Sequence, residues 1–349
     1  MESPKISAVL PCYNHKKYLA ERIRSILNQT LPVSQIIFLD DASTDGSLEL
    51  AKELLQNTKT EISIHSNSVN SGSPSKQWNN GVSLAKHPYI WIAETDDSCD
   101  ARLLERLHEN IISNQTVLSF AQSRYIDDAG KDLGSLLAYT DWRWPGVFGK
   151  DFCTEGHQFN TTYMWLINAI PNASSVLFSR HAYLKAGMAN ESMIYCGDWD
   201  CWIRMCEQGR IGFVAEELNF FRWHHETTRA KRYSAQKAAE FLACRLLATS
   251  QDTRCCIAKA QKTKDKERAS ERHRFGRDEL QKPLSAFRSV NWGSVSRTRH
   301  YYQQLDRVPT ISGQTWKIIT CLSFYTFARQ RIASRVARAH SHALGRTDK

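Results

Sequence analysis

The strongest constraint on the fold is an alternation of short apolar runs with longer amphipathic segments in the first third of the chain. Four runs have the length and the β-branched content of strands: ISAVL, QIIFLD, ISIHS and YIWIAE. The segments between them place apolar residues at helical spacing, and Asn14 is available to cap the first of these helices. Strands that alternate with such helices form parallel sheets covered on both faces. We therefore predict a doubly wound α/β unit over residues 1–110.

Polar residues follow three of these predicted strands. The first strand meets PCYN, the second runs into DDASTDGS, and the fourth ends in ETDD at residues 94–97. In open parallel sheets, ligands bind beyond the carboxyl ends of the strands. Taken alone, DDASTDGS is also explained as a turn in which Asp45 or Ser47 caps the next helix. The convergence of three such groups at one edge of the sheet favours a ligand site.

The order and spacing of these motifs resemble those of family 2 glycosyltransferases, the GT-A-type group that uses nucleotide-sugar donors. The first part of the chain resembles the donor half of that family in the segments ISAVLPCYNHKKYLAERIRSILNQT and QIIFLDDASTDGS. It resembles the family's acidic metal motif in YIWIAETDD. Its acceptor half resembles a second block, from NASSVLFSRHAYLKAG to GDWDCWIRMCEQGRIGFVAEELNFFRWH. The resemblance covers about residues 5–228 in collinear order.

The resemblance implies an α/β fold with a GT-A-type Rossmann-like central sheet, mostly parallel, and a helical C-terminal extension. It divides the chain into a nucleotide-sugar and metal-binding half over residues 1–110, an acceptor-binding half over 111–228, and a basic helical extension over 229–349. The implied activity is an inverting transfer of a sugar from a nucleotide-diphosphate donor to a hydroxyl of a saccharide or lipid-linked acceptor, in surface polysaccharide or glycan biosynthesis. A catalytically inactive member that acts as a scaffold or binding protein is the alternative.

The acidic cluster at 94–97 supplies oxygen ligands for a divalent cation. Mg²⁺ or Mn²⁺ between the phosphates of a sugar nucleotide needs only one or two protein ligands and stabilises the leaving diphosphate as a Lewis acid. By resemblance, Asp97 is the metal ligand, and Asp96 contacts the ribose or shares the ion; these two roles are interchangeable. Glu94 stands where many family members have Asp. It is expected to support these ligands and not to bind the metal directly. The structural alternative is a solvated strand end paired with Lys or Arg.

Asp40 follows its strand at the depth where this family recognises the nucleotide base. Its carboxylate is expected to accept a hydrogen bond from a pyrimidine ring N–H, and Tyr13 or Pro11 to pack against the ring. Asp41 is expected to hold the ribose or the loop.

The second half must supply a base, because a carboxylate removes the proton of the acceptor hydroxyl as that hydroxyl attacks. Asp198 lies in the opening turn of a predicted helix and matches the family's base, although Gly197 stands where a Glu is usual. The alternative for Asp198 is a helix cap. Asp200 is expected to face solvent.

Two further groups of residues carry predictions about ligands. His224 fits an Arg-x-His pattern and is expected to contact the metal or the diphosphate, the alternative being a packed histidine. Arg222 is expected to pair with the phosphates or with an acidic neighbour. Aromatic side chains in the variable middle of the chain stack on an acceptor sugar or belong to the core: Trp142, Trp144 and Tyr163.

The net charge of +10 is concentrated near the C-terminal end. Residues 251–349 have 21 Lys and Arg against 8 Asp and Glu, whereas residues 1–250 have 25 against 28. A nucleic-acid-binding protein would present a basic patch with aromatics across its body, and this near-neutral body argues against that class. Residues 316–345 form a predicted basic amphipathic helix that either contacts an anionic membrane or packs on protein.

The cysteines and the apolar segments indicate the compartment. The ten cysteines show no C-x-x-C pair, and Cys196, Cys201 and Cys206 are expected to be reduced core thiols. We find no signal-peptide pattern and no apolar stretch of spanning length. The expectation is a cytoplasmic protein, at the inner face of the cell membrane if the tail binds lipid.

Overall fold

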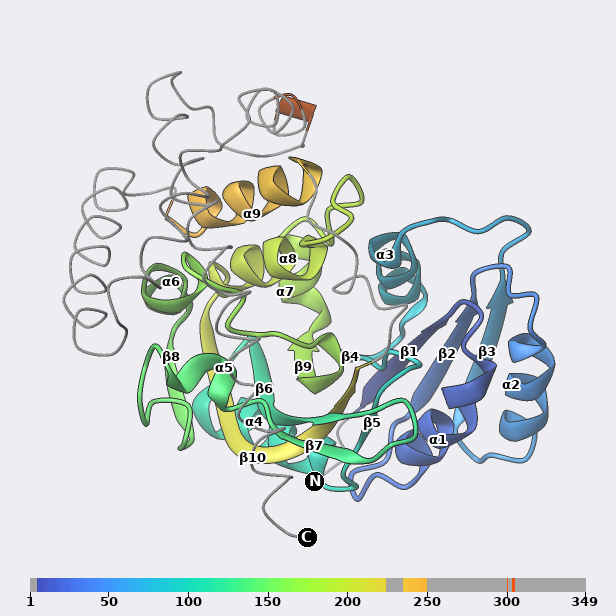
Figure 1. Cartoon of the computed structure of the whole chain (residues 1–349). Coiled ribbons are helices and arrows are strands. Elements are labelled where there is room, and N and C mark those ends of the chain that lie inside the picture. Colours follow the sequence, from blue (N-terminus) through green and yellow to red (C-terminus); the bar gives the residue numbers. More distant parts are fainter. Residues whose placement is uncertain (1–4, 224–234, 250–299, 301–302, 305–349) are drawn as a thin grey trace, which may run out of the picture. The chain divides into compact units, whose positions relative to one another are not determined.

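The computed structural model describes residues 5–223, 235–249, 300 and 303–304 (Figure 1). Its contacts divide the chain into two compact units, Met1–Lys231 and Arg232–Lys349. The described part of the second unit contains the helix α9 (Ala235–Leu247). The first unit is built on one ten-stranded sheet covered by helices, which confirms the predicted α/β class with a Rossmann-like central sheet.

Four parallel strands form the first half of the sheet, in the order β3-β2-β1-β4. The apolar runs predicted these strands: β1 (Ile6–Cys12), β2 (Gln35–Asp40), β3 (Glu61–Ser66) and β4 (Tyr89–Ile92). The helices between them are α1 (Lys16–Leu27), α2 (Ser47–Leu55) and α3 (Pro74–Leu84). β1 is longer than predicted, because Pro11 and Cys12 still pair with β2 where its pairing with β4 has already ended.

The second half of the sheet continues through an antiparallel strand. β9 (Val176–Ser179) runs antiparallel to both β4 and β6 (Leu118–Ile126), so β4 and β6 point the same way. β10 (Arg210–Arg222) pairs with β6 in parallel. Most strands therefore share one direction, as predicted. The remaining strands run antiparallel to their partners: β5 (Ser98–Cys99), β7 (Asp132–Ser135) and β8 (Phe152–Glu155).

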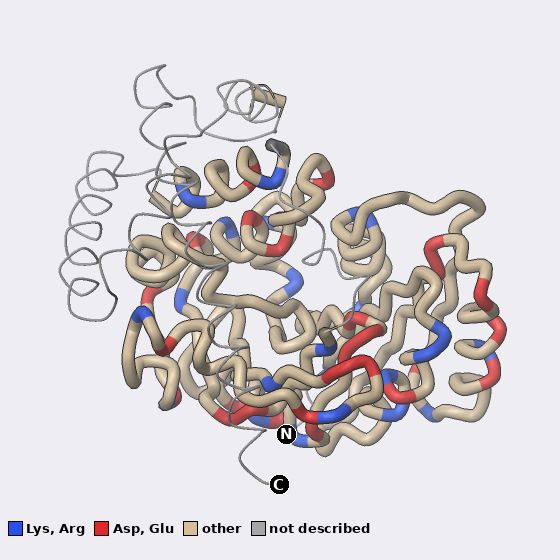
Figure 2. Tube along the Cα trace, viewed as in Figure 1, with Lys and Arg blue, Asp and Glu red and all other residues tan. Residues whose placement is uncertain are grey.

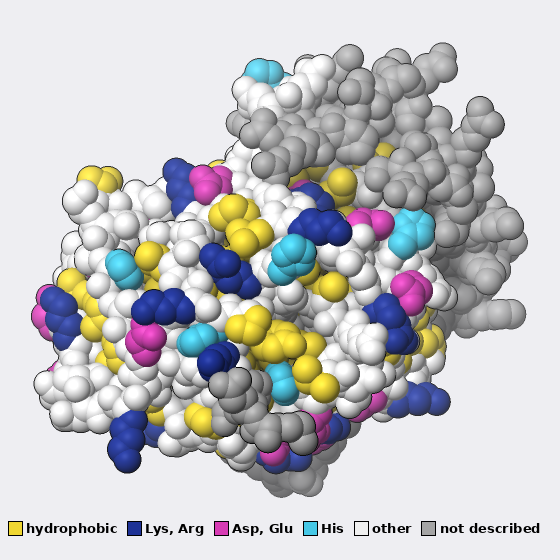
Figure 3. Space-filling model, turned by 180° about the vertical axis from the view of Figure 1, so that it is seen from behind, with side chains coloured by type: hydrophobic (Ala, Val, Ile, Leu, Met, Phe, Trp, Pro, Cys, Tyr) yellow, Lys and Arg dark blue, Asp and Glu magenta, His cyan; other side chains and the backbone are white. Residues whose placement is uncertain are grey.

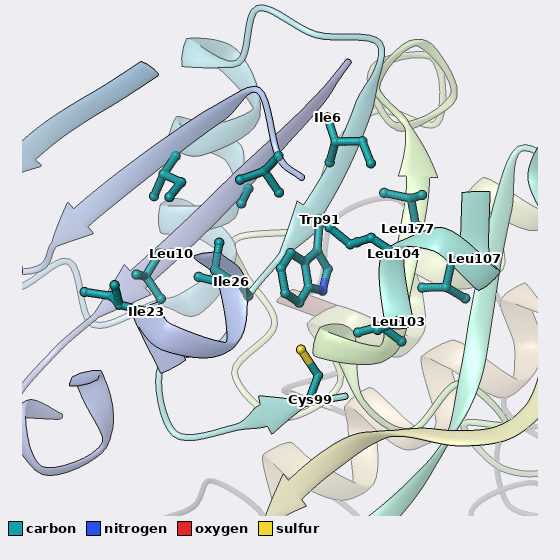
Figure 4. Packing of buried hydrophobic residues seen from close by; sticks show 14 of the residues in the cluster. Ile6, Leu10, Ile23, Ile26, Trp91, Cys99, Leu103, Leu104, Leu107 and Leu177 are labelled. Atoms are coloured by element: carbon teal, nitrogen blue, oxygen red, sulfur yellow. The ribbon is translucent and has the colours of Figure 1, made fainter. Parts of the chain in front are cut away.

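The core beneath the site forms around Trp91 of β4. Figure 4 shows its ring among the side chains of Ile26 from α1 and of Leu103 and Leu104 from α4 (Leu103–Asn114). All four side chains are almost completely buried. The indole Nε1 donates to the carbonyl of Ser174 over 2.7 Å, so the polar edge of this ring is satisfied inside the core.

The loops after β1 and β2 are held by capping bonds that differ in part from the prediction. His15 occupies the N-cap position of α1, and Asn14 instead accepts a hydrogen bond from the Thr44 amide through Oδ1. Asn14 adopts a left-handed conformation (φ 53°) that takes it out of the capping geometry. Asp45 accepts the Lys16 amide at Oδ2 and the Ser47 amide at Oδ1, so it satisfies the first amides of α1 and α2 although Gly46 occupies the N-cap position of α2.

The surface and the thiols agree with the composition. Seen from behind, the described residues present basic side chains interspersed with acidic and hydrophobic ones (Figure 3). Cys196, Cys201 and Cys206 are buried thiols, as expected of core cysteines. Among the described helices, none has the length and apolar character required to cross a bilayer.

Candidate active site

The acidic stretch after β4 lies beside the end of β1. Its acidic residues Glu94, Asp96 and Asp97 are red in Figure 2. Between them, Thr95 is buried, and its hydroxyl donates to the carbonyl of Pro11 at the end of β1. Because Asn14 also accepts the Thr44 amide, all three predicted polar groups meet at one edge of the sheet.

Asp97 is the most enclosed carboxylate of this stretch, with only 2% of its surface exposed. Its Oδ1 accepts the backbone amide of Arg222 and its Oδ2 accepts Nδ2 of Asn172, each over 3.0 Å. Burial and the charge of Asp96 raise the pKa of Asp97 above its usual range. A cation bound beside these two carboxylates would relieve this penalty, because it favours their charged forms.

Glu94 is partly buried, and its longer side chain reaches across to α3. Its Oε1 accepts Nε1 of Trp78 over 2.7 Å, and its own amide donates to the Ser174 hydroxyl over 3.1 Å. Burial and the neighbouring Asp96 raise the pKa of Glu94 to about 8. Glu94 is therefore held by a buried tryptophan and a serine hydroxyl. The structural alternative for this cluster was instead a solvated strand end paired with Lys or Arg.

Arg22 is a charged residue of this region that the motif analysis missed. It is completely buried on α1, and its guanidinium lies 4.6 Å from the centre of the Trp91 ring. Among the described residues, its Nε and Nη2 have no hydrogen-bond partner. Its positive charge partly offsets the rise in the pKa values of Glu94 and Asp97, which burial and Asp96 cause. The signal was its place on the apolar face of α1, between Leu19 and Ile26.

Asp40 ends β2 with an unsatisfied oxygen. Only 2% of the residue is exposed, and its Oδ2 accepts the Ser43 amide and the Ser66 hydroxyl over 3.2 and 3.0 Å. Within the described residues, Oδ1 has no hydrogen-bond partner although it is buried. Leaving a buried acceptor unpaired costs about 1–3 kcal/mol, so a ligand that donates a hydrogen bond here would remove a real penalty.

The other predicted donor-side residues differ in their surroundings. Asp41 is buried and accepts Asn67 Nδ2, the Ser71 amide and Gln77 Nε2 at Oδ1, over 2.7 to 2.9 Å. These bonds correspond to the second of its two predicted roles, holding the loop. Pro11 is buried within β1, whereas Tyr13 is 46% exposed.

Asp198 lies in the first turn of α8 (Gly197–Cys206). Cys196 occupies the N-cap position, so the capping alternative for Asp198 is not the arrangement found. Its Oδ2 accepts Nδ2 of Asn168 over 2.8 Å. The start of a helix favours a negative charge. A Cβ atom on Gly197 would come 2.7 Å from the Ser75 hydroxyl of α3, so a larger side chain here would require this serine to move.

Asp200 was expected to face solvent, and that prediction is wrong. It is only 3% exposed and forms an ion pair with Arg204 one turn later on α8. Arg204 also donates to the carbonyl of Ala186 at the end of α7 (Arg180–Lys185), which holds the pair against the domain. Helical spacing alone placed Asp200 on the wrong face because it takes no account of this partner.

Arg222 is 1% exposed and has its guanidinium nitrogens engaged. Nη2 contacts Glu21 over 2.6 Å, Nε donates to the carbonyl of Asp96 over 2.7 Å, and Nη1 donates to the carbonyl of Asp127 over 2.8 Å. Of its two predicted partners, the acidic neighbour is the one found. His224, the other predicted ligand, lies outside the described residues.

The aromatic residues of the middle segment separate into two groups. Trp142 is 48% exposed, with the guanidinium of Arg143 lying 5.1 Å from its ring centre. Trp144 and Tyr163 contact one another edge to face at 5.0 Å and both lie near the buried Phe148. This second pair therefore packs with the core, which was one of its two predicted alternatives.

Asp97 and Asp198 are about a hundred residues apart in sequence, yet one short segment holds both carboxylates. Asn168 donates to Asp198 and Asn172 donates to Asp97. Four residues span at most about 14 Å between Cα atoms. The two carboxylates that the motifs singled out therefore lie within the same small region of the first unit.

The donor atoms fit a cation that receives most of its ligands from a substrate. Asp96 and Asp97 provide hard carboxylate oxygens, the type that Mg²⁺ and Mn²⁺ prefer. No group of three or more His, Cys, Asp or Glu side chains within the described residues is arranged to hold a metal by itself. A site with one or two protein ligands is what a phosphate-bound cation requires.

Comparisons with known proteins agree with this arrangement. Residues 7–172 match the family model described as glycosyl transferase family 2. The chain is 27% identical over 228 residues to a poly(ribitol-phosphate) beta-glucosyltransferase of Bacillus spizizenii, covering 62% of this chain and 35% of that protein. It is 31% identical over 153 residues to glycosyltransferase GlyG of Streptococcus pneumoniae, covering 44% of this chain and 47% of that protein. The chain thus spans less than half the length of these relatives.

A solved structure shares the fold. The crystal structure of S. aureus TarS residues 1–349 in complex with UDP-GlcNAc aligns with a TM-score of 0.63 at 15% identity, covering 96% of this chain and 92% of that one. At this identity, the match speaks for the fold. The family match, together with the collinear motifs, shows that residues 7–172 of the chain belong to glycosyltransferase family 2.

Proposed function

We propose that the protein is an inverting glycosyltransferase that moves a sugar from a nucleotide-diphosphate donor to a hydroxyl of a saccharide or lipid-linked acceptor. The observation that carries this proposal is the attachment of Asp97 and Asp198 to the single segment 168–172. One carboxylate belongs to the acidic cluster suited to a phosphate-bound cation, and the other opens a helix. Transfer with inversion needs these two functions on opposite sides of one sugar ring.

The donor is a uridine nucleotide in this proposal. The unpaired Oδ1 of Asp40 is an acceptor, and uracil presents a ring N–H at its pairing edge, whereas the cytosine ring presents an acceptor nitrogen there. The exposed ring of Tyr13 and the buried Pro11 are the candidate surfaces for the base. S. aureus TarS, which shares the fold, has been solved with UDP-GlcNAc and with UDP, which supports the same choice.

Asp96 and Asp97 would hold the divalent cation, Mn²⁺ or Mg²⁺, with His224 as a further predicted contact. When bound, such a cation acts as a Lewis acid that stabilises the developing charge of the diphosphate. Arg22 contributes a positive charge from its buried position on α1, beside Trp91. Arg222 holds the stretch in place through two hydrogen bonds. Its backbone amide donates to the Asp97 carboxylate, and its side chain donates to the Asp96 carbonyl.

Asp198 is the proposed base. Its carboxylate takes the proton of the acceptor hydroxyl while the hydroxyl oxygen forms a bond to the anomeric carbon. The bond from that carbon to the donor phosphate oxygen breaks, and its electron pair leaves with the nucleoside diphosphate. Attack from the face opposite the leaving group inverts the anomeric configuration.

The acceptor class rests on the relatives. Those compared include the poly(ribitol-phosphate) beta-glucosyltransferase of Bacillus spizizenii and a chondroitin synthase of Escherichia coli, which is 24% identical over 245 residues. Their names support a role in surface polysaccharide or glycan biosynthesis. A cytoplasmic location, with residues 316–345 at an anionic membrane, would suit a lipid-linked acceptor; that segment lies outside the described residues.

The test is nucleotide release by the purified chain of residues 1–349. A panel of UDP-, GDP-, CDP- and dTDP-sugars is incubated with candidate acceptors, with Mn²⁺, with Mg²⁺ or with EDTA. We expect UDP release from at least one donor, stimulated by the metal and abolished by EDTA, with an inverted anomer in the product by NMR. Release from none of these donors in the presence of acceptor would contradict the proposal.

A further inference from the structure

Two asparagines in the segment 168–172 are locked by the same local motif. In Asn168, Oδ1 accepts the amide of Ile170 over 3.3 Å. In Asn172, Oδ1 accepts the amide of Ser174 over 2.7 Å. Because each side-chain oxygen is occupied by a backbone N–H two residues later, each NH₂ group must point the other way.

Each of these NH₂ groups donates to one of the two carboxylates. Nδ2 of Asn168 lies 2.8 Å from Oδ2 of Asp198, and Nδ2 of Asn172 lies 3.0 Å from Oδ2 of Asp97. The two asparagines, four residues apart, thus make the same kind of contact with two different parts of the chain, the first turn of α8 and the acidic stretch after β4.

We propose that Asn168 is a positioning residue for Asp198, and that residues 168–172 act as a bracket that sets the distance between the base and the cation-binding carboxylate. This inference rests on the proposed function. Asn168 touches neither substrate in this role; it fixes the direction from which the Asp198 carboxylate meets the acceptor hydroxyl. A misplacement of about 1 Å can reduce a rate about 100-fold, so such a bracket would have a direct effect on turnover.

The surroundings of the bracket favour rigidity. Asn172 is 5% exposed, and its carbonyl accepts both the amide and the hydroxyl of Ser175, over 3.3 and 2.7 Å. Pro171 restricts the backbone between the two asparagines. Ser174 then ties the end of the segment to Trp91 and to the amide of Glu94. The bracket is therefore anchored in the core at its Asn172 end.

Asn168→Asp is the sharpest test because it is isosteric. The new carboxylate can still accept the Ile170 amide, so the local turn is kept, but the hydrogen bond to Asp198 is lost and replaced by repulsion between two carboxylates. We expect kcat to fall by about tenfold or more, while the Kd of the UDP-sugar with Mn²⁺, measured by calorimetry, stays within about twofold. Asn172→Ala should instead weaken donor binding as well as transfer, because it releases Asp97.

Asn114→Asp is the matched control. It makes the same chemical change at the end of α4, where the Asn114 amide donates to a backbone carbonyl of its own helix, and it should leave both constants unchanged. Circular dichroism and the Tm establish that each variant is folded. A kcat for Asn168→Asp within about twofold of the wild type, or a loss of donor affinity equal to the loss of turnover, overturns the positioning role. A wild-type chain that transfers no sugar overturns the proposed function and this role together.

Discussion

Nε1 of Trp78 lies 2.7 Å from Oε1 of Glu94, and the same indole packs against Trp202 of α8 with ring centres 5.8 Å apart. Trp78 is 5% exposed. The acidic stretch after β4 is thus joined through one side chain of α3 to the helix that carries Asp198. This contact is a second link between the two halves of the site, beside the segment 168–172.

Trp78→Phe should keep an aromatic ring at this position, although a smaller one, and remove the hydrogen bond to Glu94. We expect the free energy of unfolding to fall by about 1–3 kcal/mol, because a buried acceptor loses its partner. Urea denaturation measures this change. Trp165→Phe is the control: its Nε1 donates to the carbonyl of the exposed Thr162, where water can replace it. Equal effects of the two substitutions would contradict the importance of the Trp78 contact.

The metal-free protein should lose stability as the pH rises from about 5 to 8. Burial raises the pKa of Glu94 to about 8 in the folded chain, above its value of about 4.5 in an unfolded one. The folded state therefore binds the proton more tightly, and this contribution is present at low pH and lost as the pH rises through the folded pKa.

Thermal unfolding in EDTA across this pH range tests the prediction. Glu94→Gln mimics the protonated side chain, so its Tm should change less with pH than that of the wild type. A wild-type Tm that rises steadily between pH 5 and pH 8, or an unchanged slope in the variant, would show that Glu94 does not govern this dependence.

Asp97→Ala and Asp198→Ala should separate the two proposed roles. Both substitutions should abolish detectable transfer, because one removes a cation ligand and the other the base. Only Asp97→Ala should strongly weaken the metal-dependent binding of the donor, measured by calorimetry with and without Mn²⁺. The division of roles is wrong if the two variants lose donor affinity to the same extent.

Asp40→Asn should change the preferred nucleotide. The Ser43 amide and the Ser66 hydroxyl both donate to Oδ2, so the amide oxygen should stay there and the NH₂ group should replace Oδ1. A donor would then face the ring N–H of uracil, and we expect the Kd of UDP to rise by about tenfold or more, the equivalent of one lost hydrogen bond to a charged group. CDP, whose ring nitrogen accepts, should gain relative to UDP in a competition assay. An unchanged UDP-to-CDP ratio would exclude Asp40 from base recognition.

Local patterns were sufficient for the elements of the first half of the sheet. The strands β1 to β4 and the helices between them follow from hydrophobic periodicity, which is a property of neighbouring residues. The polar groups PCYN, DDASTDGS and ETDD were also correctly expected to meet, because parallel strands place their carboxyl ends at one edge of a sheet. Pro11 was assigned to the loop after the first strand, but it lies within β1. A proline is compatible with a strand at a point where the pairing with one neighbouring strand has already ended.

The individual contacts of the site depended on pairings between distant segments. Arg204 turns Asp200 away from solvent, Asn168 and Asn172 bring two remote carboxylates under one segment, and Arg22 is enclosed by the core around Trp91. Periodicity predicts which face of a helix or strand is apolar. It does not predict which polar side chain from another segment will contact that face. The sequence by itself therefore determined the alternating fold and the positions of the acidic motifs. The tertiary structure decided which carboxylates are buried, paired or left with an open lone pair, because those properties depend on partners that only folding brings within hydrogen-bond distance.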